Sequence, residues 1–164
     1  MVLEAGTAIE LIPETDRTAM SRLTYVTTLD DAYFFLNQSK GLPKIPSVKP
    51  LQQRLARACI LHSWIALEEM LDYAIEDLRK QGKMKEPPAR PLSEKLKAVL
   101  SARGSLALDM KDFSVARKVR NILVHPTPNK SEDHFLTLEQ ASSVFNYCLT
   151  TIRAISPYNV TLRI

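Results

Sequence analysis

The chain has 164 residues, of which 45% are apolar and 24% charged, and this balance fits one globular domain with its own core. Four glycines, ten prolines and abundant Leu, Ala, Glu, Lys and Arg favour helices and exclude collagen-like and disordered classes. The net charge of +4 is uneven: residues 90–130 carry nine Lys and Arg against three acidic residues, whereas residues 1–40 carry three against six. A basic segment on a near-neutral domain points to an anionic partner, with solvated surface charge as the alternative.

The sequence has the features of a cytoplasmic protein without a membrane segment. No apolar run approaches the roughly 20 residues that a bilayer crossing needs, and Glu4 and Glu10 stand where a secretory signal would be basic. Cys59 and Cys148 lie in apolar stretches far apart in sequence, so both are expected to be reduced core residues. We predict no metal and no cofactor, because the paired-cysteine spacing of a metal site is absent from the sequence.

Two helices are predicted in the N-terminal half. The first runs from about residue 14 to residue 38, with Met20, Leu23, Val26 and Leu29 at helical spacing. Gly41–Pro50 is predicted as a loop, because three prolines in ten residues cannot continue a helix. The second helix runs from Leu51 to about Gln81 and ends at Gly82. Its predicted buried stripe is Leu55, Ala58, Leu61, Ile65, Leu71, Ile75 and Leu78.

Three further helices are predicted in the C-terminal half. The third is Leu92–Arg103; the fourth begins after Asp109 or Asp112 and ends at His125-Pro126; and the fifth is capped by Thr137. Their predicted buried residues are, in turn, Leu96, Val99 and Leu100; Phe113, Ala116, Val119 and Leu123; and Ala141, Val144, Phe145, Cys148, Leu149 and Ile152.

These segments predict one domain over residues 1–164, with a leader at 1–13 and a C-terminal tail at 157–164. Five amphipathic helices can bury their apolar stripes only against one another. The expected fold class is therefore all-α, an antiparallel up-and-down helical bundle.

The segment Arg117–Pro126 is the candidate site that remains after the motifs of other site classes are found to be absent from the sequence. The sequence has no glycine-rich phosphate loop and no nucleophile elbow, and its three histidines are far apart. On a helix, Arg117, Arg120 and Asn121 share a face. Pro126 disfavours helical dihedrals at His125, so the imidazole is free to turn back toward Arg120. Arginine, amide and a titratable histidine at a helix end suit a phosphodiester.

The pattern Arg120-Asn121-x-x-x-His125 resembles the arginine, polar residue and histidine signature of the HEPN superfamily (higher eukaryotes and prokaryotes nucleotide-binding). The helix order, the long second helix and the position of the signature fit over most of the chain. The resemblance implies a small helical bundle. It also implies a metal-independent endoribonuclease, a toxin or an antiviral or stress effector, in which two protomers pair their signatures across one cleft.

Under this resemblance Arg120, Asn121 and His125 are the expected catalytic residues, and Arg117 and Lys118 are expected to bind RNA. The expected partners are RNA, a second copy of the chain, and an antitoxin or a neighbouring regulatory protein. The alternative from another class is a non-catalytic module of the same fold that binds RNA or a nucleotide, or that dimerises.

Four residues of the second helix need separate interpretation. Arg57 and His62 have the same spacing as the signature, but they lie inside the helix without a following polar residue or a break, so His62 is interpreted as a packed histidine. Glu68 falls on the predicted buried stripe, where a carboxylate is costly unless paired. It either supports Arg120 or His125, or reaches a loop amide or solvent. Trp64 is interpreted as a core or dimer-interface residue.

Overall fold

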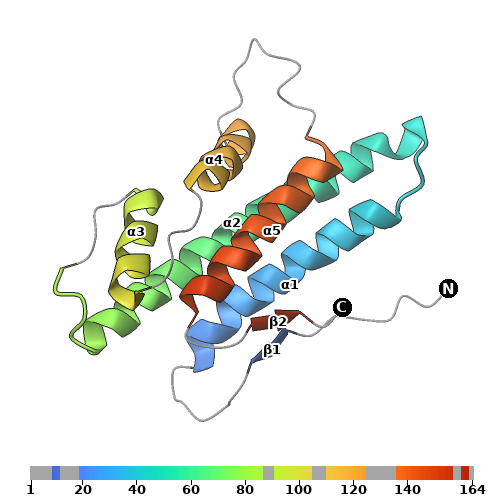
Figure 1. Cartoon of the computed structure of the whole chain (residues 1–164). Coiled ribbons are helices and arrows are strands. Elements are labelled where there is room, and N and C mark those ends of the chain that lie inside the picture. Colours follow the sequence, from blue (N-terminus) through green and yellow to red (C-terminus); the bar gives the residue numbers. More distant parts are fainter. Residues whose placement is uncertain are drawn as a thin grey trace.

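Five helices and a pair of short strands make up the described part of the chain in a computed structural model (Figure 1). The structure describes residues 9–11, 19–86, 91–104, 110–124, 136–156 and 160–162. The elements are β1 (Ile9–Leu11), α1 (Ala19–Gly41), the 3-10 helix η1 (Pro46–Val48), α2 (Lys49–Lys80), α3 (Leu92–Arg103), α4 (Met110–Val124), α5 (Leu138–Ile155) and β2 (Val160–Leu162). The predicted all-α bundle is confirmed.

Three long helices form the centre of the bundle. α1 and α2 make an antiparallel hairpin, and α5 lies alongside both, running in the same direction as α2 (Figure 1). The two shorter helices, α3 and α4, pack against α2 and α5. None of the described helices is both long enough and apolar enough to span a bilayer.

The buried face of α2 is the middle of the core. Its buried residues recur every three to four positions, which keeps one face of the helix against its neighbours. They are Ala56, Cys59, Ile60, Ser63, Trp64, Ala66, Leu67, Met70, Leu71, Ala74, Ile75 and Leu78. Truncating a fully buried member such as Leu67 to alanine would cost about 2–5 kcal/mol of folding free energy.

The predicted stripe on this helix is wrong in its N-terminal half. Ile65 is 44% exposed, and Leu55, Ala58 and Leu61 are only half-buried. Leu71, Ile75 and Leu78 are buried as predicted. Apolar residues cover two faces of α2 before residue 66, and the periodicity of the sequence does not tell which of the two faces meets α1 and α5.

The buried residues predicted for the last three helices agree with the structure. All those named for α3 and α5 are buried, as are Phe113, Ala116 and Val119 of α4, while Leu123 is partly buried. In α1 the buried stripe is Tyr25, Leu29, Ala32 and Leu36, of which only Leu29 was predicted. The side chains of Met20 and Leu23 lie outside the described residues.

The helix ends follow the local chemistry of the sequence. Thr137 and Gln140 form a capping box, in which the Gln140 amide donates to Thr137 Oγ1 (3.1 Å) and the Thr137 amide donates to Gln140 Oε1 (2.9 Å). Gly82 ends α2 with φ +70°, a backbone conformation that glycine adopts at little cost. α4 begins at Met110, so Asp112 lies in its first turn and is not its cap. Asp109, the other predicted cap, lies outside the described residues.

The loop between α1 and α2 is shorter than predicted. α1 extends to Gly41, η1 occupies Pro46–Val48, and α2 begins at Lys49. Pro50 therefore lies in the first turn of α2, where a missing amide donor breaks no hydrogen bond.

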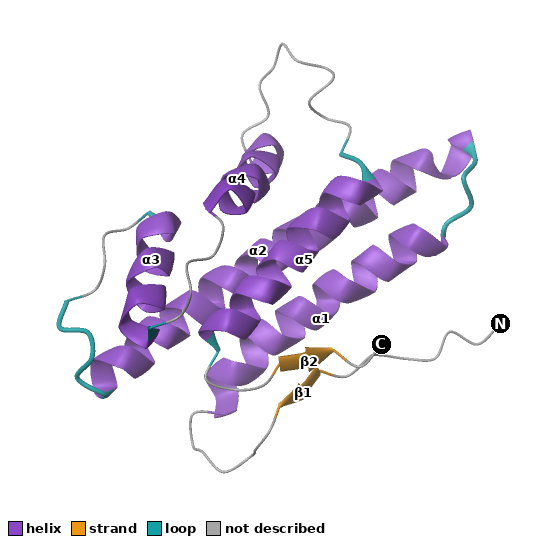
Figure 2. Ribbon diagram, in the orientation of Figure 1, coloured by secondary structure: helices purple, strands orange, loops and turns teal. Residues whose placement is uncertain are grey.

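The expected tail contains a short strand. Residues 160–162 of β2 pair with residues 9–11 of β1 in an antiparallel ladder, and Glu10 lies opposite Thr161 (Figure 2). Two strands of three residues do not change the fold class.

Both cysteines are buried and free, as predicted. Burial raises the pKa of the Cys59 thiol to about 12 and also raises the pKa of Cys148. At pH 8 we therefore expect only about one Cys59 thiol in ten thousand to be ionised in the folded protein. The native chain should resist a thiol-specific chromogenic reagent for hours, and both thiols should react at once in denaturant. Rapid reaction of one equivalent before unfolding would contradict the burial of these thiols.

Candidate functional site

α4 carries Arg120 and Asn121, the first two residues of the predicted signature, near its C-terminal end. Phe113, Ala116 and Val119 attach this helix to the core, and the helix continues through Arg120 and Asn121 to Val124. His125 is the next residue in the chain, and it lies outside the described residues together with Pro126. The geometry of the site is therefore described for its arginine and amide and not for its histidine.

Arg120 contacts a carboxylate from another helix. Its Nη2 atom lies 4.0 Å from Oε1 of Glu68 on α2, and its Nη1 atom donates to Oδ1 of Asn121 at 3.4 Å. The exposed fraction of the side chain is 28% for Arg120 and 43% for Glu68, so the pair lies at the rim of the core. Glu68 thus lies near Arg120 and also reaches solvent, so both of the expected contacts are present. A guanidinium has five N–H donors, so these contacts leave donors for an anionic ligand.

Glu68 does not lie on the buried face of α2, although the sequence placed it on the predicted stripe. Its neighbour Leu67 is fully buried, whereas Glu68 is turned by about 100° toward the side on which α4 packs. Because the Glu68 side chain reaches solvent, it avoids the free-energy cost of burying a charged carboxylate in the core.

Trp64 contributes a contact that sequence reasoning missed. The indole Nε1–H donates to Glu68 Oε1 at 3.0 Å, one helical turn along α2. The side chain is buried, as expected for a core residue, and its ring centroid lies 5.7 Å from that of Phe113 on α4. The four-residue spacing between Trp64 and Glu68 was visible in the sequence and could have indicated the hydrogen bond.

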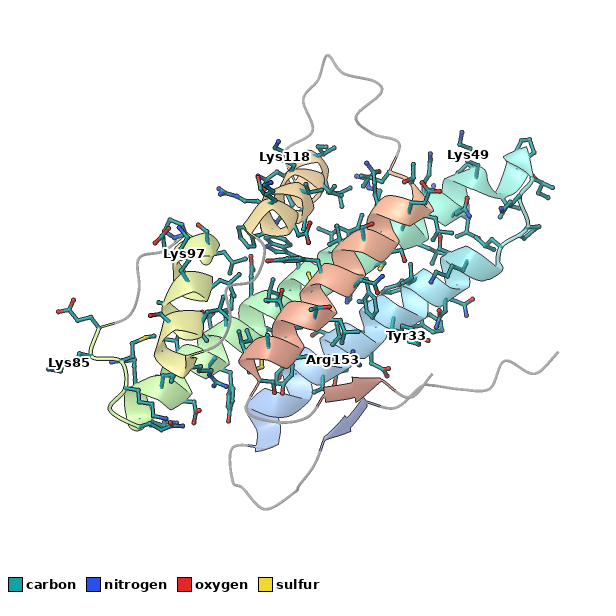
Figure 3. The ribbon with its side chains drawn as sticks, viewed as in Figure 1. Tyr33, Lys49, Lys85, Lys97, Lys118 and Arg153 are labelled. Atoms are coloured by element: carbon teal, nitrogen blue, oxygen red, sulfur yellow. The ribbon has the colours of Figure 1, made fainter. Side chains whose placement is uncertain are left out.

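The basic segment of the sequence is not uniformly basic in space. The cations of α3 are paired with acids: Lys95 with Asp72, Lys97 with Glu94, and Arg103 with Asp77. Arg117 and Lys118 on α4 are exposed and form no ion pair with a described residue. Lys118 lies on the same side of the molecule as Lys97 in the view of Figure 3, away from Tyr33 and Arg153. Within the basic segment, the exposed cations without an acidic partner among the described residues are thus on α4, the helix of Arg120.

A groove of about 800 Å³ lies between α4 and α5, but it is not at this site. Its lining includes Asp112 and Glu139 and neither Arg117 nor Arg120. Two carboxylates and no described basic side chain make this groove unsuitable for a phosphodiester.

Arg57 and His62, the second pair with the arginine and histidine spacing, lie on α2. His62 faces α1, whereas Glu68 faces Arg120 of α4. The His62 ring packs edge-on against Phe35 of α1 with a centroid distance of 5.1 Å, and its Nδ1 atom lies 3.7 Å from Oδ2 of Asp31. The side chain is half-buried. Packing against Phe35 agrees with the interpretation of His62 as a packed histidine.

Comparisons with protein-family models, curated proteins and solved structures found no match to this chain. Among the described residues, no three His, Cys, Asp or Glu side chains gather as metal ligands would. The functional assignment therefore depends on the Arg120 site and on the resemblance of its sequence pattern.

The Glu68–Arg120 contact can be tested by a double-mutant cycle. We expect Glu68→Gln and Arg120→Gln to show a coupling of about 0.2–1 kcal/mol in the free energy of unfolding, a small value because solvent screens the pair. The measurement is urea unfolding of the parent, both single variants and the double variant. The coupling should shrink in 1 M salt. Strictly additive effects would contradict an interaction between these side chains.

Proposed function

We propose that this chain is a metal-independent endoribonuclease of the HEPN type, a toxin or an antiviral or stress effector that cleaves RNA in a dimeric composite site. The observation that carries the proposal is the placement of Arg120. Its guanidinium lies between the Glu68 carboxylate and the Asn121 amide, at the rim of the core and just before His125 in the chain. The unpaired cations Arg117 and Lys118 on the same helix suit a polyanionic substrate.

The proposed chemistry uses the 2′-hydroxyl of RNA as the nucleophile. His125 of one protomer accepts the 2′-hydroxyl proton, and the 2′-oxygen forms a bond to the adjacent phosphorus. The bond from phosphorus to the 5′-oxygen breaks, and this oxygen takes a proton from His125 of the second protomer. The products are a 2′,3′-cyclic phosphate and a 5′-hydroxyl. Arg120 stabilises the charge that develops on the phosphoryl oxygens, and Asn121 orients the histidine or binds a phosphate oxygen.

A second copy supplies the complementary proton donor, because one copy offers a single titratable group at the signature. The surface beside Arg120 and Glu68 is suited to a two-fold contact. Ile65 lies one turn before Glu68 on α2, Val124 lies one turn after Arg120 on α4, and both side chains are exposed. Apolar side chains around a polar centre can bury area while the two signatures meet at the axis.

Substitutions at Arg120 and His125 should lower activity and leave stability nearly unchanged, whereas substitution of His62 should lower stability and leave activity unchanged. We expect Arg120→Ala and His125→Ala each to lower RNA cleavage about a hundredfold or more, because charge stabilisation or proton transfer is lost. The thermal midpoint of Arg120→Ala should change little, since the Glu68 carboxylate left behind still reaches solvent. His62→Ala should lower the midpoint through lost packing on Phe35, while activity per folded molecule remains.

The assay uses a labelled RNA with chelator present, and a matched substrate without 2′-hydroxyls should not be cleaved. If His125→Ala cleaves RNA as well as the parent protein, the catalytic assignment is wrong. RNA binding without cleavage by the parent protein would support the binding-module alternative instead.

The proposed dimer has a matched pair of test variants. Ile65 is 44% exposed and lies beside the site, whereas Val115 is 58% exposed and lines the groove between α4 and α5. We expect Ile65→Glu to give a monomer in light scattering and to abolish cleavage, because a charge enters the apolar contact. Val115→Glu should remain dimeric and active. A fully active monomer would contradict the composite site.

A further inference from the structure

We propose that Trp64 is a positioning residue for Arg120, and that its indole N–H holds the Glu68 carboxylate where that carboxylate meets the guanidinium. The consequence for catalysis rests on the proposed function, since it requires Arg120 to act on RNA. The positioning itself can be measured without RNA.

A single oxygen links the three side chains. Glu68 Oε1 accepts the indole N–H of Trp64 at 3.0 Å and lies 4.0 Å from Arg120 Nη2. An indole nitrogen is a hydrogen-bond donor only. It therefore binds the carboxylate and offers the arginine no alternative acceptor. The carboxylate is therefore held from the core side by a neutral donor and faces the guanidinium on the other side.

The donor is fixed in place by its surroundings. Trp64 is only 4% exposed, and its ring packs against Phe113 of α4, which in turn packs against Tyr147 of α5 with a centroid distance of 6.2 Å. The indole thus contacts the helix that carries Arg120 and also binds the side chain that faces Arg120. Without this donor, a glutamate that is 43% exposed would populate several rotamers in solvent.

The same ring has a packing role, so the test must separate the N–H from the ring. Trp64→Phe removes the donor and keeps an aromatic ring against Phe113. Phe145→Leu is the matched control for weakened packing, because the ring contact of Phe145, at 5.7 Å, is with Tyr33 of α1 and not with Trp64.

The first measurement is the mobility of the Arg120 guanidinium by ¹⁵N relaxation of its Nε–H group, assigned with Arg120→Lys. We expect this group to be ordered in the parent and in Phe145→Leu, and to lose order in Trp64→Phe. Because Trp64 is the only tryptophan, its single indole resonance also reports the hydrogen bond. Glu68→Ala should move that resonance and release Arg120 to the same extent. This second variant keeps the whole core, so it tests the link even if Trp64→Phe does not fold.

The second measurement is RNA cleavage. We expect Trp64→Phe to lower kcat about tenfold with KM changed less than twofold, because a misplaced arginine stabilises the transition state less well. Adding Trp64→Phe to Glu68→Ala should lower kcat no further, since both changes break the same link. Phe145→Leu should keep the parent kcat per folded molecule.

The outcomes separate this proposal from the proposed function. Unchanged order of the Arg120 Nε–H group in folded Trp64→Phe, or in Glu68→Ala, overturns the positioning role, whatever the cleavage assay gives. Loss of that order in a protein whose parent form does not cleave RNA supports the positioning role and overturns the ribonuclease. Equal loss of order in Phe145→Leu overturns the positioning role, because general loosening of the core would then explain the effect.

Discussion

Burial of one face of α2 against α1 and α5 fixes the directions of Trp64, Ile65 and Glu68, the side chains of α2 on which the proposed site depends. Once Leu67 and its equivalents one turn apart point into the core, the remaining directions around the helix are determined. Glu68 then lies at the edge of the buried face, on the side where α4 packs, and Ile65 faces outward. A rotation of α2 that buried Ile65 would remove Glu68 from Arg120. The packing of the core and the geometry of the site are thus one constraint.

α4 is held in place by contacts of two kinds. Phe113 packs on Trp64 of α2, and seven residues later Arg120 meets Glu68, also of α2. The apolar contact provides most of the attachment, because an ion pair at the rim of the core contributes little in water. The polar contact instead fixes the direction of the guanidinium. A short helix can therefore present a cation at a defined place while most of its own charges stay in solvent.

The electrostatics of the surface depend on which cations have acidic neighbours. α3 contributes two lysines and one arginine, and each of them pairs with an acid of α2 or of α3 itself. Arg117 and Lys118 have no such neighbours among the described residues, and the groove on the α5 side of α4 carries carboxylates. Of the described cations in residues 90–130, Arg117 and Lys118 are therefore available to a polyanion, and they lie on the helix that carries the proposed site.

The sequence by itself determined the presence of the five helices, some of their ends and the buried faces of α3 and α5. The capping box at Thr137, the glycine stop at Gly82 and the apolar spacing in α3 and α5 act over a few residues, so a linear pattern records them. The tertiary structure alone decided which face of α2 is buried, because both faces before residue 66 are apolar and only the positions of α1 and α5 distinguish them. It also brought Arg120 to Glu68, since a contact between residues 52 positions apart depends on the docking of α4 and not on local spacing.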